Sequence, residues 1–158
     1  MNAEIIKKTT LLTIFFCTLN IAAIVNAAKL FADKSTLSDD KTFELTISVD
    51  KVEKLAGIKL SLSYDKSLFK YLKMERSKQT QSLMHVVNDK NPGKLIIVMA
   101  GATGKSGINL KLMKLTFDLL REVPADRKFV FEVKEIQLMS DELKDIPCPI
   151  EKIEGKFP

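Results

Sequence analysis

The sequence of 158 residues contains no tryptophan, only two tyrosines and a single histidine. Proteins that grip flat polysaccharide use exposed planar aromatic side chains, which combine a large apolar face with a polar edge. Tryptophan is missing here, and packing in a core explains the positions of Tyr64 and Tyr71. This shortage disfavours direct binding to crystalline cellulose.

The single histidine, His85, offers little for catalysis or metal binding. A histidine can act as a general base or a metal ligand, but no nucleophile motif such as Gly-x-Ser-x-Gly is present. A zinc site would need further thiolate or imidazole ligands, and Cys148 is the only other such side chain beyond residue 27. We predict that His85 is a structural residue on a strand and that the protein is not an enzyme.

Residues 1–27 have the pattern of a secretory signal peptide. Two lysines precede a largely apolar stretch from Leu11 to Val25, and small residues lead up to Ala27. We predict cleavage near Ala27, export to a periplasmic or extracellular location, and one mature domain of residues 28–158. The alternative is a retained membrane anchor, although the stretch is short for a span of about 20 residues.

Cleavage would leave Cys148 as the only cysteine, so no disulfide could form within the domain. Small exported domains often depend on disulfides, and this one must instead depend on its core. We interpret Cys148, which lies between two prolines, as a small buried residue. An intermolecular disulfide is the alternative.

The net charge of +5 comes from 25 basic and 20 acidic residues that are interspersed along the chain. A protein that binds nucleic acid would cluster its basic residues on one face. We therefore expect no nucleic-acid partner and interpret the lysines as solvated surface residues.

Short segments with alternating apolar residues dominate the mature sequence, which is typical of strands with one buried face. We expect Phe43, Leu45, Ile47 and Val49 to point inward, whereas Leu68–Met74 could form one helical turn and 76–82 a loop. Short strands at this spacing predict an all-β fold, a β-sandwich. The expected strands are Leu30–Ala32, Thr42–Val49, Gly57–Tyr64, Leu83–Asn88, Leu95–Ala100, Leu110–Leu119, Phe129–Val133, Ile136–Met139 and Ile150–Ile153.

Residues 101–107 are rich in glycine and include Gly104-Lys105-Ser106, the end of a phosphate-binding loop motif. That motif needs a glycine at the position of Met99 and a following helix whose amides bind phosphate. Both features are missing, because Leu110–Leu119 has the alternation of a strand. We interpret residues 101–107 as a flexible strand connection.

Acidic pairs occur in two expected turns, at Asp39-Asp40 and at Asp141-Glu142 with Asp145 nearby. Calcium takes six to eight oxygen ligands, so these turns could contribute to a calcium site, but no EF-hand spacing is present. Acidic residues in turns usually face water, and we expect no cofactor.

One predicted sheet face carries an unusual number of outward apolar side chains. If Leu95, Ile97 and Met99 point inward, then Ile96, Val98 and Ala100 point outward. Met84 and Val86 share this outer side if Leu83, His85 and Val87 point inward. Contiguous exposed apolar patches mark interaction surfaces. The alternatives are that loops cover the patch or that the inward and outward assignment is reversed.

The segment Ala56–Tyr71 resembles a characteristic stretch of the cohesin domain family. In that family a small residue and a glycine precede an alternating strand and the sequence Tyr-Asp-Pro-Ser-Leu. Here Gly57 precedes an alternating strand that ends in Tyr64-Asp65-Lys66-Ser67-Leu68, with lysine in place of proline. Residues 93–119 and 129–140 are similar to later strands of the family in the same order, so the resemblance spans about residues 29–158.

The resemblance implies a nine-stranded jelly-roll β-sandwich, related in architecture to some cellulose-binding modules. Cohesins are non-catalytic receptors that capture dockerins, which need calcium to fold, in bacterial cellulose-degrading assemblies. The dockerin docks on one sheet face, here expected at Lys59, Ser61, Ser63, Met84, Val86, Ile96 and Val98. Family members often carry an acidic or amide side chain where Lys59 stands, so the partner's charge pattern should differ.

We therefore predict a secreted binding module that captures a dockerin-like partner, with a link to polysaccharide degradation. Two alternatives remain open. One is a module that binds carbohydrate directly, and the other is an accessory protein of the cell envelope or secretion machinery. Architecture cannot separate these functions, because function depends on the site and not on the fold.

Overall fold

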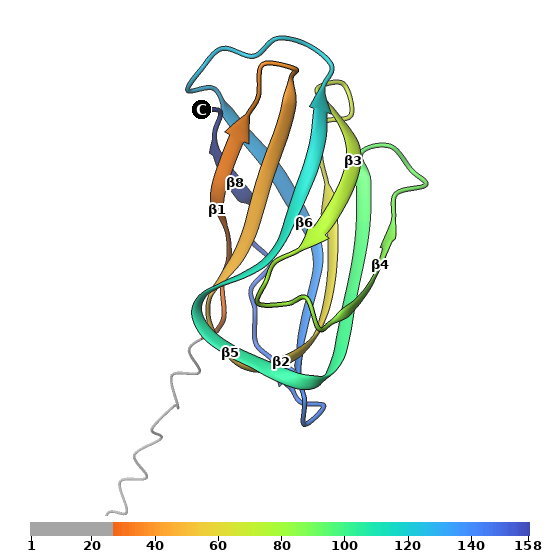
Figure 1. The fold of residues 1–158 in the computed structure, drawn as a ribbon, viewed down its shortest axis with the longest axis vertical. Coiled ribbons are helices and arrows are strands. Elements are labelled where there is room, and N and C mark those ends of the chain that lie inside the picture. The colour runs from red at the N-terminus through yellow and green to blue at the C-terminus, as the bar shows by residue number, and fades with distance from the viewer. Residues whose placement is uncertain (1–26) are drawn as a thin grey trace, which may run out of the picture.

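A computed structural model describes residues 27–158, so the predicted signal peptide lies outside the described residues except for Ala27 (Figure 1). The described part consists of strands, turns and connecting segments, without a helix. Its eight strands are β1 (Leu30–Leu37), β2 (Thr42–Ser63), β3 (Phe69–Arg76), β4 (Met84–Asn88), β5 (Lys94–Leu119), β6 (Lys128–Ser140), β7 (Asp145–Ile146) and β8 (Ile153–Lys156).

Two long strands, β2 and β5, build both layers of a sandwich (Figure 1). In the first layer, residues 42–52 of β2 pair with β1 and with the second half of β5, which also pairs with β3. In the second layer, residues 57–63 of β2 lie between β6 and the first half of β5, with β4 as the strand beyond β5. The expected all-β jelly-roll sandwich is confirmed.

The pairing of β2 with β5 continues around the bend of the sandwich, where the sequence predicts a flexible connection. Val52 pairs with Gly107, and Leu55 pairs with Lys105. Register shifts on both sides of Leu55, together with a positive φ of 55° at Lys54, let the strands turn without separating. The prediction of a loop at residues 101–107 is therefore wrong. The four separate strands expected within residues 42–64 and 95–119 form two continuous strands, β2 and β5.

The helical turn expected at Leu68–Met74 is also wrong, because residues 69–74 begin β3 and pair with β5, and Leu68 belongs to the turn before the strand. A register shift between Tyr71 and Lys73 places an extra residue, Leu72, in the strand. This bulge interrupts the alternation and gives the apolar residues a spacing that imitates one turn of helix.

The ends of the domain differ in smaller ways from the prediction. Strand β1 extends to Leu37, and the two segments expected after Phe129 form the single strand β6. The last strand begins at Ile153 rather than at Ile150, whose side chain is exposed.

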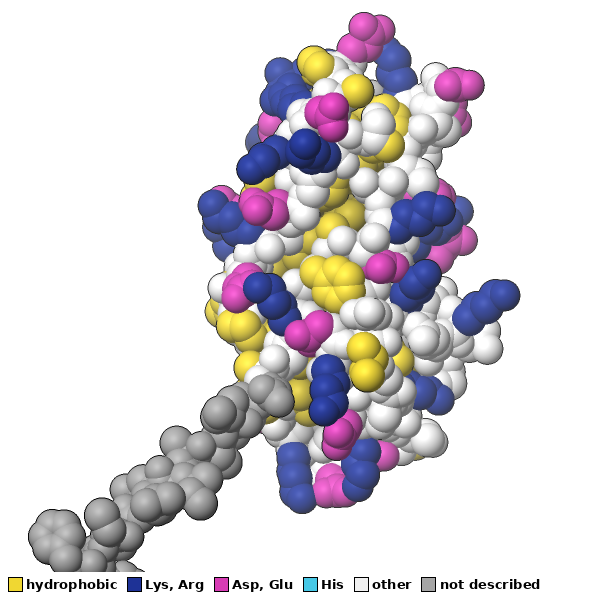
Figure 2. All heavy atoms as spheres, turned by 90° about the vertical axis from the view of Figure 1, so that its left-hand side faces the viewer, with side chains coloured by type: hydrophobic (Ala, Val, Ile, Leu, Met, Phe, Trp, Pro, Cys, Tyr) yellow, Lys and Arg dark blue, Asp and Glu magenta, His cyan; other side chains and the backbone are white. Residues whose placement is uncertain are grey.

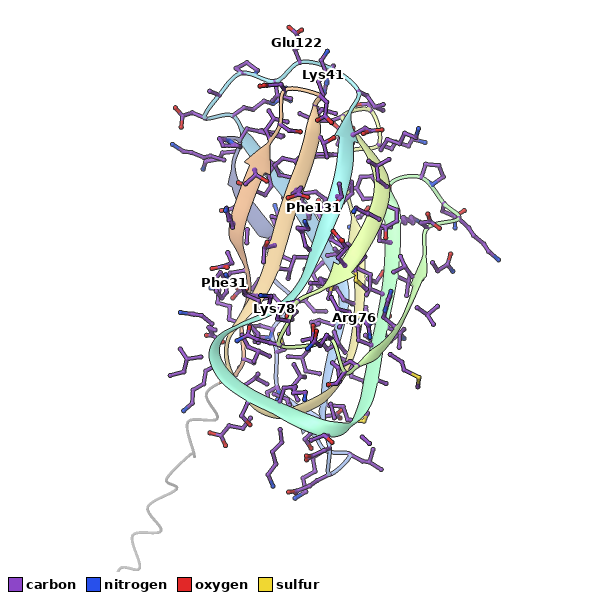
Figure 3. All side chains as sticks on the ribbon, viewed as in Figure 1. Phe31, Lys41, Arg76, Lys78, Glu122 and Phe131 are labelled. Carbon is purple, nitrogen blue, oxygen red and sulfur yellow. The ribbon has the colours of Figure 1, made fainter. Side chains whose placement is uncertain are left out.

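The space between the layers is filled by aliphatic side chains and a cluster of phenylalanines. Phe43, Leu45, Ile47 and Val49 are fully buried, as predicted. Phe117 lies at the centre of the cluster, and its ring centroid is 5.2 Å from that of Phe131, labelled in Figure 3, and 5.4 Å from that of Phe69. Tyr64 and Tyr71 pack edge-on against Phe117. Core packing therefore accounts for both tyrosine rings, as the sequence predicts.

Candidate functional site

The outer face of the second layer is formed by β4, β5, β2 and β6, in that order. Because side chains on neighbouring strands stand beside one another in a sheet, the register aligns them in rows across the four strands. The three central rows are Met84–Ala100–Gly57–Met139, Val86–Val98–Lys59–Gln137 and Asn88–Ile96–Ser61–Glu135. We call this surface the β4–β6 face.

The predicted binding residues all lie on the β4–β6 face. Leu95, Ile97 and Met99 are buried, whereas Ile96 and Val98 are 40% and 41% exposed. On β4, Met84 and Val86 are 77% and 68% exposed. Lys59, Ser61 and Ser63 alternate with buried residues on β2 and are half-exposed. The inward and outward assignment for β5 and β2 is thus confirmed, and an apolar surface crosses β4 and β5.

His85 pairs with the buried Met99 and so stands on the inner side of its sheet, as expected, but its side chain is exposed. Leu83 is buried and Val87 half-buried, as expected of inward residues. Among the described strands, β4 is hydrogen-bonded only to β5, and it forms the margin of its layer. At that margin the inner side of a strand extends past the core, and an imidazole can remain in water.

The polar part of the face is held by contacts between neighbouring strands. The ammonium group of Lys59 lies 2.6 Å from a carboxylate oxygen of Glu135 on β6. The side-chain amide of Gln137 donates to the carboxylate of Asp145 at 3.2 Å. The hydroxyl of Ser63 donates to the carbonyl oxygen of Gly93 at 3.3 Å. These contacts fix the polar side chains beside the apolar surface before any partner binds.

A shallow groove of about 270 Å³ crosses the face where β5, β2 and β6 meet. Gly57 forms its floor, and a Cβ atom at this position would lie 3.2 Å from the Cβ atom of Met139. The side chains of Val98, Lys59 and Met139 line the groove. It can accept a small apolar side chain from a protein that docks on the face.

The contribution of β6 to the face was missed in the sequence prediction. Phe129, Phe131 and Val133 are buried at odd positions, but Leu138 is buried at an even one. The register shift between Ser61 and Leu62 marks a bulge in β6 at this point. The same switch of the apolar residues from odd to even positions is visible in the sequence. It could have been used to predict that Glu135, Gln137 and Met139 point outward.

The acidic turns make contacts within the protein. The carboxylate of Asp40 accepts a hydrogen bond from the backbone N–H of Thr42, and Asp141 accepts one from Gly104. Hydrogen bonds from Lys144 and Lys54 lower the pKa of Glu142 to about 2. Across residues 27–158, no three His, Cys, Asp or Glu side chains come together as a metal site.

Cys148 is half-buried and packs against the core. Burial raises the pKa of its thiol to about 11. A free thiol with so little thiolate is poorly suited to redox chemistry or metal binding. In the same described range, no helix has the length and apolar character to cross a membrane.

Comparison with known proteins shows to which family the chain belongs. The sequence pattern of the Cohesin domain matches residues 28–153. The chain belongs to the cohesin domain family. A search of curated protein sequences finds no match.

The fold of this cohesin domain is similar to solved structures from several organisms. A non-cellulosomal cohesin from the archaeon Archaeoglobus fulgidus has a TM-score of 0.66 at 10% identity, covering 84% of this chain and 91% of the other. The sixth cohesin of scaffoldin B from Acetivibrio cellulolyticus, solved with a dockerin, has a TM-score of 0.68 at 11% identity, covering 84% and 99%. A type I cohesin–dockerin complex from Clostridium thermocellum has a TM-score of 0.64 at 15% identity, covering 83% and 93%.

Proposed function

We propose that this cohesin domain is an exported, non-catalytic receptor that captures a dockerin-like domain on its β4–β6 face. Family membership supports a protein-binding module, and two of the similar structures are complexes of cohesins with dockerins. The observation that carries the proposal is the apolar surface of Met84, Val86, Ile96 and Val98, which stands exposed on hydrogen-bonded strands.

This surface has the composition of a protein-binding site. Interfaces between proteins combine an apolar centre with a polar rim, and a few well-packed anchors supply most of the binding energy. On the β4–β6 face the apolar side chains of β4 and β5 adjoin the polar side chains of Lys59, Ser61 and Glu135. The apolar part supplies area that is removed from water, and the polar part supplies specificity.

The lysine at position 59 suggests how the partner differs from those of other cohesins. Because Lys59 is paired with Glu135, a positive and a negative group stand side by side on the face. A partner that docks here must satisfy both groups or displace one of them, and leaving a buried charge unpaired would be costly. We infer a partner that presents an acidic group toward Lys59 and a donor toward Glu135.

The test is a pull-down with the immobilised domain, residues 28–158, from the secreted and envelope proteins of its own organism. One half of the sample receives a calcium chelator. We expect a specific partner that is lost on chelation, because dockerins need calcium to fold. A partner retained in chelator would contradict the dockerin assignment and support an accessory role in the envelope or secretion machinery. The identity of a chelator-sensitive partner would show whether polysaccharide degradation is involved.

A second function, direct binding of a glycan, is favoured by a different observation. A pocket of about 260 Å³ brings together Tyr64, Tyr71 and Asp89, with Lys66 and Lys70 beside them. Burial, followed by the charge of Asp89, raises the pKa of Tyr71 to about 12, so its hydroxyl keeps its proton in alkaline as well as in neutral solution. Rigid aromatic rings with a few polar groups are typical of small-molecule sites.

Retention on insoluble glucans tests this second function. The Tyr71→Phe variant keeps the ring that packs on Phe117 and removes only the hydroxyl. Firm retention of the natural domain that is weakened in Tyr71→Phe would establish the glycan site. Absence of retention, together with a protein partner in the pull-down, would exclude it.

A further inference from the structure

Within residues 27–158, five strands have one hydrogen-bonded neighbour each: β1, β3, β4, β7 and β8. An open strand edge presents unpaired N–H and C=O groups to other proteins, and natural proteins protect such edges with charges, bulges, short strands or covering segments. Comparing the protection of these five edges therefore shows which one is available for pairing.

Four of the edges are protected. Strand β1 carries Lys34 and a register shift at Asp33, and β8 lies beside it, where the hydroxyl of Ser35 donates to the carbonyl of Lys156. Figure 2 shows this side of the molecule, where acidic and basic side chains border a narrow apolar strip. Strand β3 has a bulge, and charged residues stand between its apolar residues. Strands β7 and β8 are only 2 and 4 residues long.

Strand β4 has five residues and, within residues 27–158, no charge, bulge or covering segment protects it. Its sequence, Met-His-Val-Val-Asn, contains no residue with a permanent charge and no proline. Its pairing with β5 runs from Met84 to Asn88 without a register shift. It forms the margin of its layer in Figure 1, and Met84 and Val86 are its most exposed apolar side chains.

We propose that β4 pairs antiparallel with β4 of a second copy of this chain, around a two-fold axis at Val86. Most oligomers of identical chains have closed two-fold symmetry, in which one patch meets itself. With the axis at Val86, its side chain meets Val86 of the other copy, and Met84 meets Asn88. Directly opposed side chains in such a pair lie about 5 Å apart, close enough for the two valines to be in contact.

The charges around β4 are compatible with this register. Asp89 would lie opposite Leu83, and Lys90 would lie opposite Ser82, so no like charges face each other. A two-fold axis at the neighbouring residue would place His85 or Val87 opposite itself and would separate the two Val86 side chains. With the axis at Val86, β4 places this valine opposite itself and opposes no like charges, so a second copy can pair along this edge without repulsion.

The inference goes beyond the proposed capture of a partner, because it uses the edge of β4 and not the β4–β6 face. Pairing in the plane of the sheet would place two such faces side by side. The contact is small compared with stable protein interfaces, so association should be weak and depend on concentration.

The test is sedimentation of residues 28–158, which contain the whole described sandwich, between about 10 µM and 1 mM, a range suited to weak association. We expect a reversible monomer–dimer equilibrium. The Val86→Lys and Val86→Glu variants should each be monomeric, because like charges would meet at the axis, and mixing them should restore a dimer. Circular dichroism establishes that both variants are folded.

The matched control is Val98→Lys, which places the same charge on the same face but one strand away from the edge. This variant should associate like the natural domain. The proposal is overturned if the natural domain stays monomeric at the highest concentration, if Val86→Lys still associates, or if Val98→Lys is equally monomeric. Amide exchange in β4 should also slow as concentration rises, and unchanged exchange would count against pairing.

Discussion

Lys59 and Glu135 form an ion pair across β2 and β6, with 2.6 Å between the ammonium nitrogen and a carboxylate oxygen. Both side chains are about half-exposed, at 45% and 50%. Exposed pairs of this kind contribute only about 0–1 kcal/mol to stability. The pair therefore matters less for folding than for the charge pattern of the β4–β6 face.

The Lys59→Glu variant tests this role. It would place two carboxylates beside one another, repel the acidic group expected on the partner, and weaken capture by about tenfold or more. The melting temperature should change little, because the site is exposed. The measurement is a titration of the partner by calorimetry, with Lys73→Glu on β3 as the control for a general charge effect. Undiminished affinity in Lys59→Glu would show that the partner does not contact this pair.

Phe117 should be the most sensitive position in the aromatic core. Its ring packs on Phe69, Phe131 and both tyrosines, so Phe117→Ala would leave a cavity between the layers. Such truncations cost about 3–5 kcal/mol of unfolding free energy. Urea denaturation measures this loss, and Val130→Ala on the surface of β6 should cost less than about 1 kcal/mol. Similar losses for the two variants would contradict the described packing.

Glu142 should make stability depend on pH in the acid range. Hydrogen bonds from Lys144 and Lys54 lower its pKa from 4.5 to about 2 in the folded protein. The folded state therefore binds this proton less readily than the unfolded chain does. The resulting stabilisation is complete above pH 4.5 and is lost as the pH falls toward 2.

Thermal unfolding across this pH range measures the effect. On acidification, the melting temperature of the Glu142→Gln variant should fall less than that of the natural domain. Glu122→Gln serves as the control, because the side chain of Glu122 is 90% exposed. Its carboxylate lies 3.7 Å from the ammonium nitrogen of Lys41, and Figure 3 labels both residues at one end of the sandwich. Equal slopes for the natural domain and Glu142→Gln would show that the contacts of Glu142 do not persist in solution.

Cys148 should react slowly with alkylating reagents while the domain is folded. Burial raises the pKa of its thiol from 9.0 to about 11, which lowers the thiolate fraction at pH 8 by about 100-fold relative to an unperturbed cysteine. We expect the iodoacetamide reaction to accelerate by at least that factor in guanidinium chloride. Comparable rates in the folded and denatured chain would contradict the half-buried position.

The sequence allowed the sandwich and most of the site to be predicted, because alternation fixes the direction of side chains wherever a strand is regular. Ile58, Leu60 and Leu62 are buried while Lys59 and Ser61 face outward, as their alternation indicates. The same principle failed at Leu72, where a bulge interrupts the alternation of β3.

Long-range pairing accounts for the remaining differences. Residues 101–107 have the composition of a loop, and only their contacts with the bend of β2 make them part of a strand. Likewise, the position of Glu135 beside Lys59 depends on the register between β2 and β6, which no local pattern in either strand determines. His85 is exposed because, in the part of the chain that the structure describes, β4 has no neighbour beyond it in its layer.

The most direct test of the central claim is the affinity of the captured partner for a domain with Ile96→Asp and Val98→Asp. Both side chains are exposed, so the variant should remain folded, as circular dichroism would confirm. A matched double variant, Thr42→Asp and Thr46→Asp, places the same charges on the first layer. We predict that capture is abolished by the changes on β5 and preserved by those on β2. Full capture by the Ile96→Asp, Val98→Asp domain would contradict binding on the β4–β6 face.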